Sequence, residues 1–155
     1  MPALMALATL PSLASVTTAG PEEAIAEYCE PLLSGSSAEA VTAIAIADGF
    51  EEQLLGAQKV LISGELIVGL SASPRVCFVQ APSQMTLEQG FALADGWAAR
   101  HQGAVRSAAT SGPDGAPVRG WSVPAQRLSL VATQQTAGTG KKVMAFILLP
   151  PAPQR

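Results

Sequence analysis

The chain has 155 residues, of which 48% are hydrophobic and 14% charged, and this composition fits one folded domain with a continuous core. The formal net charge is −3, yet residues 22–52 hold eight acidic side chains and no basic one. The basic residues elsewhere are scattered and aromatic residues make up only 5%, which argues against nucleic-acid binding. The acidic segment predicts a helical face presented either to a partner or to solvent.

Residues 1–19 have the features of a secretory signal peptide. They carry no charge, contain an apolar run from Ala3 to Leu10, and end in small residues that suit a cleavage site. The positively charged start of such peptides is missing, so the segment is either a signal peptide with an upstream start or an apolar tail on a cytosolic protein. Pro2 and Pro11 interrupt a segment already short of the about 20 apolar residues of a spanning helix, so we expect no membrane span.

Two N-terminal helices are predicted next. The first begins at residues 20–23, because proline suits the first helical position and carboxylates suit the positive end of the helix dipole. Pro31 should kink or end it. The second begins at a capping box formed by Ser36 and Glu39 and stops near Gly49. Its buried face should comprise Val41, Ile44 and Ala45.

The two cysteines, Cys29 and Cys77, favour a disulfide and an oxidising compartment. Their pairing would close a loop of 48 residues, which in the chain-entropy model contributes about 4 kcal/mol of stability. Two buried free thiols are the alternative. Together with the leader, the cysteines predict a periplasmic or secreted protein.

Short apolar and β-branched runs separated by turn residues predict an antiparallel sheet of five to seven strands. A capping box formed by Thr86 and Gln89 opens a middle helix that extends to about Arg100. The run 143–149 is apolar on both faces, as expected of a central strand. We find no internal repeat. The seven runs are 59–63, 65–71, 75–80, 104–110, 117–123, 127–133 and 142–149.

These elements predict a single α+β domain over residues 20–150. The two N-terminal helices and the middle helix should cover one face of the sheet, because each has one apolar stripe to bury. Residues 151–155 should form a flexible tail, because Pro150, Pro151 and Pro153 end regular structure.

The motifs that resemble catalytic or nucleotide-binding sites are incomplete. Residues 138–141, Gly-Thr-Gly-Lys, lack two fixed positions of a phosphate loop and join two strands, so a hairpin tip is expected there. Ser71 follows Gly69 as in a nucleophile elbow, but the second glycine is absent. With one histidine and two distant cysteines, no metal site has the required spacing. We therefore expect neither metal nor cofactor.

His101, the only histidine, carries the catalytic alternative. It could act as a general base for Ser71 or Ser122, or pair with a Cys77 thiolate, in a small hydrolase. The thiolate competes directly with the disulfide. His101 could instead suit the negative end of the middle helix or face solvent.

The candidate interaction residues are Trp97, Trp121, Arg119 and His101, since tryptophan and arginine dominate interface hot spots. Burial of both tryptophans in the core is the alternative. In the absence of an assembled catalytic group, the sequence predicts an exported, non-catalytic binding or accessory protein whose partner is another envelope protein. The competing functions are the small hydrolase and a structural component of the envelope.

Overall fold

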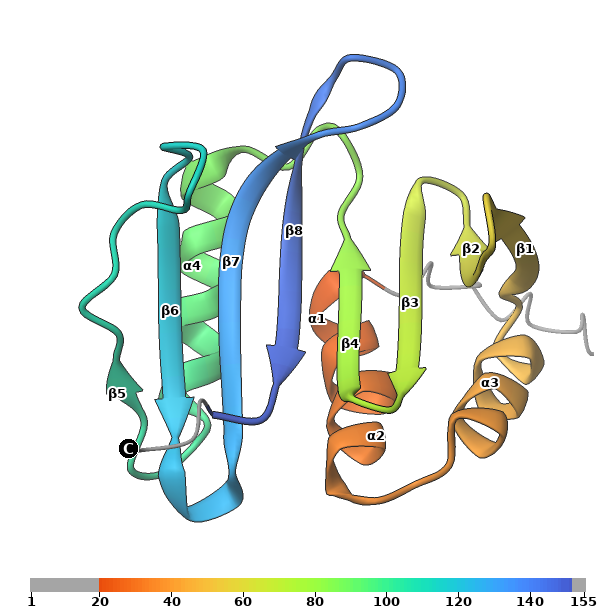
Figure 1. Cartoon of the computed structure of the whole chain (residues 1–155), viewed down its shortest axis with the longest axis horizontal. Helices are drawn as coiled ribbons and strands as arrows, with labels where there is room; N and C mark the ends of the chain where they lie inside the picture. The colour runs from red at the N-terminus through yellow and green to blue at the C-terminus, as the bar shows by residue number, and fades with distance from the viewer. Residues whose placement is uncertain (1–19, 152–155) are drawn as a thin grey trace, which may run out of the picture.

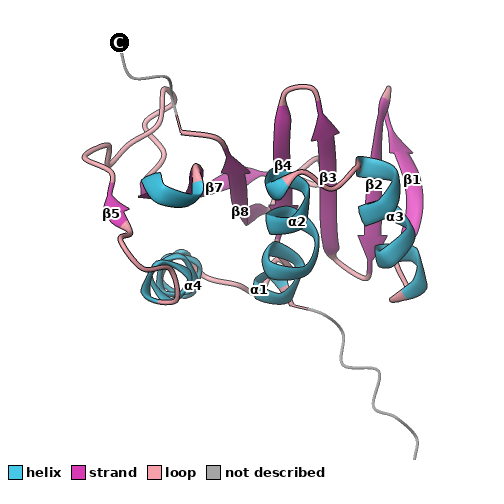
Figure 2. Ribbon diagram, turned by 90° about the horizontal axis from the view of Figure 1, so that it is seen from below, coloured by secondary structure: helices cyan, strands magenta, loops and turns pink. Residues whose placement is uncertain are grey.

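The structure, a computed structural model, describes residues 20–151, which form one antiparallel sheet of eight strands with helices against one face (Figure 1, Figure 2). The strand order is β1-β2-β3-β4-β8-β7-β6-β5. The predicted leader, residues 1–19, and residues 152–155 of the predicted tail lie outside the described residues. The strands are β1 Glu51–Leu55, β2 Gln58–Ser63, β3 Leu66–Ala72, β4 Arg75–Gln80, β5 Val105–Arg106, β6 Val118–Val123, β7 Leu128–Thr136 and β8 Lys142–Leu149.

The α+β class is confirmed, and the strand count is one higher than the predicted five to seven. The additional strand is β1, whose residues are all exposed and which pairs only with β2. Its sequence, Glu-Glu-Gln-Leu-Leu, lacks both β-branched residues and alternation, so the local pattern gives no strand signal. The run 104–110 contributes only the two residues of β5.

Helices α1 (Pro21–Ala24) and α2 (Glu30–Ser34) are joined through a π-helical turn, η1 (Ile25–Cys29), into one continuous N-terminal helix. Pro31 was expected to kink or end this helix, yet the helix continues to Ser34. Proline cannot donate a hydrogen bond, and its ring crowds the carbonyl four residues earlier. The wider π turn immediately before Pro31 accommodates that constraint within the helix.

Helices α3 (Ala38–Ala47) and α4 (Leu87–Ala99) both begin at side-chain caps. The predicted box at Thr86 is confirmed, since its hydroxyl accepts from the Gln89 N–H and the Gln89 side chain accepts from the Thr86 N–H. The α3 cap is Ser37 and not the predicted Ser36. Ser36 instead closes the N-terminal helix, because its N–H donates to the carbonyl of Pro31. A short 3-10 turn, η2 (Pro124–Gln126), links β6 to β7.

The topology is a duplication that the sequence does not display. Helix α3 followed by β1 to β4, and helix α4 followed by β5 to β8, are each a helix and a four-stranded antiparallel meander. The last strands of the two units, β4 and β8, pair antiparallel at the centre of the sheet, so an approximate two-fold axis passes between them. The N-terminal helix packs over this seam, with α3 and α4 on either side of it (Figure 2).

The core lies between the helices and the sheet. The predicted disulfide is confirmed: Cys29 in the N-terminal helix is bonded to Cys77 in β4, with an S–S length of 2.02 Å and both residues buried. Arg75 also holds the end of this helix, because its guanidinium donates to the carbonyls of Leu32 and Ser36. Among residues 20–151, no helix has the length and apolar character needed to cross a bilayer. The largest fully buried side chains include Trp97, Tyr28, Phe146, Ile25 and Leu32.

Candidate functional site

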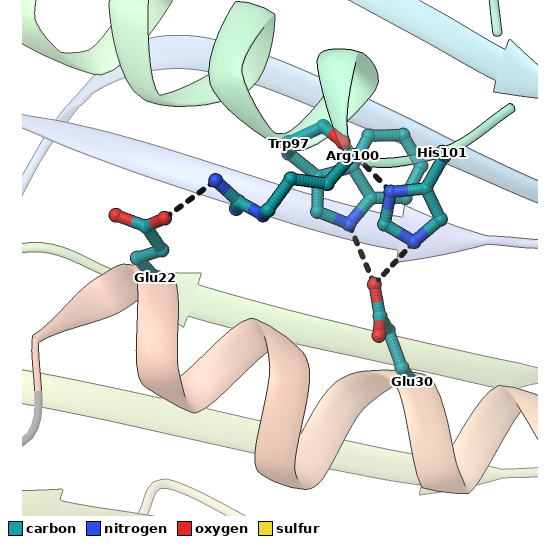
Figure 3. Close-up of polar contacts among 5 residues, drawn as sticks. All are labelled: Glu22, Glu30, Trp97, Arg100 and His101. Carbon is teal, nitrogen blue, oxygen red and sulfur yellow. Dashed lines mark hydrogen bonds and ion pairs between the residues drawn. The ribbon is translucent and has the colours of Figure 1, made fainter.

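A polar cluster formed by Glu30, Trp97 and His101 joins the N-terminal helix to the end of α4 (Figure 3). Glu30 Oε1 accepts a hydrogen bond from Trp97 Nε1 at 2.7 Å and lies 2.8 Å from His101 Nε2. The imidazole packs on the indole with ring centroids 4.2 Å apart. The His101 side chain is 12% exposed and that of Glu30 is 26% exposed, so the contact is largely shielded from water.

Both nitrogens of the His101 ring face oxygen acceptors. While Nε2 faces Glu30, Nδ1 lies 2.7 Å from the carbonyl oxygen of Trp97. Each ring nitrogen therefore lies within hydrogen-bond distance of an acceptor, whichever of them carries the proton. In this arrangement neither nitrogen is free to take a proton from a nucleophile. The cluster therefore acts as a structural clamp between helices.

A second cluster ties β6 to α4. Asp95 accepts from Arg119 Nη1 at 2.7 Å and from Trp121 Nε1 at 3.0 Å. The Arg119 guanidinium also lies over the Phe91 ring, 4.7 Å from its centroid. Two of the candidate interaction residues thus bond within the molecule. Of the other two, Trp97 is only 2% exposed and His101 belongs to the clamp.

The residues of the hydrolase alternative do not come together. Helix α4 and His101 lie on the covered face of the sheet, whereas strand alternation places Ser71 and Ser122 on the opposite face. The Ser122 hydroxyl there lies 3.0 Å from that of Ser129. Cys77 is held in the disulfide. The sheet thus separates the histidine from both serines.

An apolar groove of about 400 Å³ lies between α3 and strands β1 to β3. Its walls include Ala43 and Ile46 of α3 and Leu61, Val68 and Leu70 of the sheet. Charged side chains also line it: Glu39, Glu52 and Lys59, the last two paired at 3.4 Å and exposed.

The duplicated topology explains why this groove is open. In the second unit, α4 fills the space over the sheet with Phe91 and Trp97. At the corresponding place in the first unit, α3 presents Ala38, Thr42 and Ala43 to the groove. These small side chains leave unfilled the volume that large rings occupy on the other side of the seam.

Exposed apolar side chains occur on two of the elements that border this groove. Five large hydrophobic side chains are exposed in the described part of the chain, and four of them are on α3 and β1. They are Ile44, Ile46, Leu54 and Leu55, between 48% and 66% exposed. Ile44 was expected in the core and is 50% exposed, because α3 buries only Val41 and Ala45. The apolar residues on more than one side of α3 are the sequence signal for this surface.

Within residues 20–151, no three histidine, cysteine, aspartate or glutamate side chains gather closely enough to hold a metal ion. Comparison of the chain with models of protein families, with curated proteins and with solved structures finds no match.

Proposed function

We propose that this protein is an exported, non-catalytic binding protein that holds an extended, apolar and basic segment of a partner polypeptide against α3 and β1. The observation that carries the proposal is the apolar groove between α3 and strands β1 to β3, with exposed Ile46 on its wall and exposed Leu54 on the same face of β1 as groove-lining Glu52. Apolar patches of this kind on a folded surface mark binding sites.

The free edge of β1 supports an extended partner. This strand pairs with β2 on one side and is the last strand of the sheet on the other. An edge strand offers a row of unpaired backbone groups, and peptides commonly bind by adding a strand to it. Alternate side chains of the added strand would then point toward Ile46 and Leu54, on the side of the groove.

The charges around the groove support a basic partner. Glu39 and Glu52 line the groove and Glu51 lies on the edge strand, whereas Lys59, the one basic residue among the groove-lining residues, pairs with Glu52. The segment 22–52 contains no basic residue. Electrostatic complementarity therefore favours lysine or arginine in the partner segment.

The disulfide supports the choice of compartment. Cysteine pairs of this kind persist in oxidising environments such as the periplasm or the extracellular space. The predicted leader is consistent with export to either. Another protein of the envelope is the partner that such a location would supply.

The test uses two peptides of equal length, one alternating valine with lysine and one alternating valine with glutamate. We expect only the lysine peptide to bind isotope-labelled protein, with NMR shift changes at residues 51–55 and at Ala43 and Ile46. Equal binding of both peptides, or shift changes confined to other strands, would contradict the proposal.

A matched pair of variants locates the site. Ala43→Trp fills the groove from an exposed helix position and should weaken lysine-peptide binding at least about tenfold, or about 1.4 kcal/mol. Ala47→Trp, also exposed on α3 but not lining the groove, should leave binding unchanged. Unaltered binding by Ala43→Trp would exclude the groove.

A further inference from the structure

On six of the eight strands, the residues that face away from the helices are uncharged. We call this face of the sheet the open face, defined as every second residue in 58–62, 67–71, 76–80, 118–122, 129–135 and 143–149, the residues whose side chains point away from the core. None of these positions on six strands holds a charged side chain. One row across the strands, in register, is Val60, Gly69, Phe78, Ile147, Val131 and Gly120.

The centre of the open face is also strongly apolar. Phe78 and Ile147 are directly paired across the seam between β4 and β8, and both are half-buried. Ile67 on β3 and Val76 on β4 are also half-buried. An antiparallel sheet with one face in water normally carries polar residues on that face. On the central strands β4 and β8, every open-face residue except Gln80 is instead apolar, as in a sheet that is covered on both sides.

No helix of residues 20–151 lies on the open face; α3, α4 and the N-terminal helix all pack on the opposite one (Figure 2). The inward and outward residues of β8 show the difference between the two faces. Its inward Met144, Phe146 and Leu148 are in the core, while its outward Ile147 faces away from every helix. The open face therefore carries apolar residues, but no element among the described residues packs on it.

We propose that the open face is an interface between two copies of this chain, which pack sheet against sheet in a symmetric dimer. A two-fold contact brings a surface against itself, so any charge near the axis would meet the same charge. The uncharged open face avoids this repulsion. Two sheets packed face to face about 10 Å apart form a stable sandwich.

The area of the open face is large enough for a contact with a second copy of the chain. Six strands about 4.8 Å apart and about six residues long cover roughly 600 Å² per copy. Two copies would bury roughly 1,200 Å², the lower limit for specific interfaces. The proposed peptide site is independent of this contact, because the groove lies on the covered face and β1 is at the sheet edge.

Sedimentation equilibrium of the full chain tests the proposal. We expect a dimer with a dissociation constant of about 10 µM or tighter. Salt should not weaken it, since no ion pair holds it. A protein that stays monomeric at all concentrations would overturn the proposal. This includes a monomer whose own chain covers the open face, and a monomer that binds neutral phosphatidylcholine vesicles through this face.

Two variants confirm the face and guard against misfolding. Ile147→Lys should abolish the dimer, and Gln80→Lys, a half-buried polar position on β4 that tolerates a longer polar chain, should weaken it at least tenfold. Leu54→Lys, exposed on β1, is the control and should leave the dimer intact while weakening peptide binding. A folded Gln80→Lys variant that dimerises like the wild type would overturn the proposal even if Ile147→Lys fails to fold.

Discussion

Glu30, on the helix that packs over the central seam of the sheet, meets His101 at the end of α4, with Oε1 and Nε2 2.8 Å apart. The same Glu30 oxygen accepts from the indole of Trp97, so one carboxylate atom bridges two side chains at the end of α4. Beside it, Glu22 and Arg100 form a second ion pair at 2.7 Å between the same two helices (Figure 3). The Glu22–Arg100 pair is more exposed and involves no indole, so it serves as the exposed reference for the clamp.

Replacing Glu30 with glutamine should lower the free energy of unfolding by about 1–3 kcal/mol, measured by urea denaturation. Glutamine keeps an oxygen for Trp97 but removes the charge opposite His101. The control is Glu22→Gln: both side chains of that pair are about half exposed, so its loss should cost less than about 1 kcal/mol. Equal effects of the two changes would show that shielding of the clamp contributes nothing.

Two glycines of α4 should respond to alanine in opposite directions. A Cβ on buried Gly90 would lie 2.8 Å from Cγ and 3.0 Å from Sδ of buried Met144, so the Met144 side chain, α4 or β8 must shift within the core. Gly90→Ala should therefore destabilise the protein despite the better helix propensity of alanine. At Gly96 the nearest atom is an Arg100 nitrogen 3.7 Å away, and alanine should stabilise by up to about 1 kcal/mol. Thermal denaturation of the two variants gives the sign directly, and stabilisation by Gly90→Ala would contradict the close packing.

Loss of the disulfide should cost about 4 kcal/mol, since the bond closes a loop of 48 residues. The measurement compares urea denaturation of the wild type with that of the Cys29→Ala/Cys77→Ala double variant. Native protein should also resist alkylation and have a mass two protons below that of the reduced chain. Two thiols that react with alkylating agent in the protein isolated from its native compartment would contradict both the pairing and the proposed location.

Tyr28, the only tyrosine of the chain, should not ionise while the protein is folded. Burial raises the pKa of its phenol, and the hydrogen bond that the hydroxyl donates to Asp48 at 2.7 Å raises the pKa further. The pKa of Tyr28 is therefore higher in the folded state than in the unfolded state, where it is about 10. The stability contributed by the protonated phenol is fully present below about pH 10 and is lost as the pH rises above it.

The phenolate absorbance band follows this titration without interference from other tyrosines. It should appear only together with unfolding, followed by circular dichroism. Tyr28→Phe should reduce the decline of stability in the alkaline range. A phenolate band with a midpoint near pH 10 in folded protein would show that the phenol is accessible to water.

The features predicted from sequence are those encoded locally. Thr86 and Gln89 cap a helix through groups three residues apart, and the seven apolar runs mark strands by composition. Strand β1 has no such signal, because Glu51–Leu55 becomes extended only by pairing with β2. The approach of Glu30 to His101 depends on how two helices pack over the sheet, which neither residue's neighbours specify.

The groove was missed for a related reason. It exists because α3 places alanine and threonine where α4 places aromatic rings, and that comparison needs the duplicated topology. The sequence contains no repeat from which the two units could be aligned. One prediction from sequence did indicate the surface used in the dimer proposal. It is the prediction that residues 143–149 form a strand that is apolar on both faces.

The cross-link between Cys29 and Cys77 lies entirely within the part of the chain made before α4. Because synthesis runs from the amino end, both cysteines are made before α4 and β5 to β8. The helix and the strand that bring the two sulfur atoms together are also complete at that point. Oxidation can then precede the arrival of β8, the last strand, which adds to a β4 already fastened in place. An exported chain truncated after residue 85 should therefore carry the bond, and its mass before and after reduction shows whether it does.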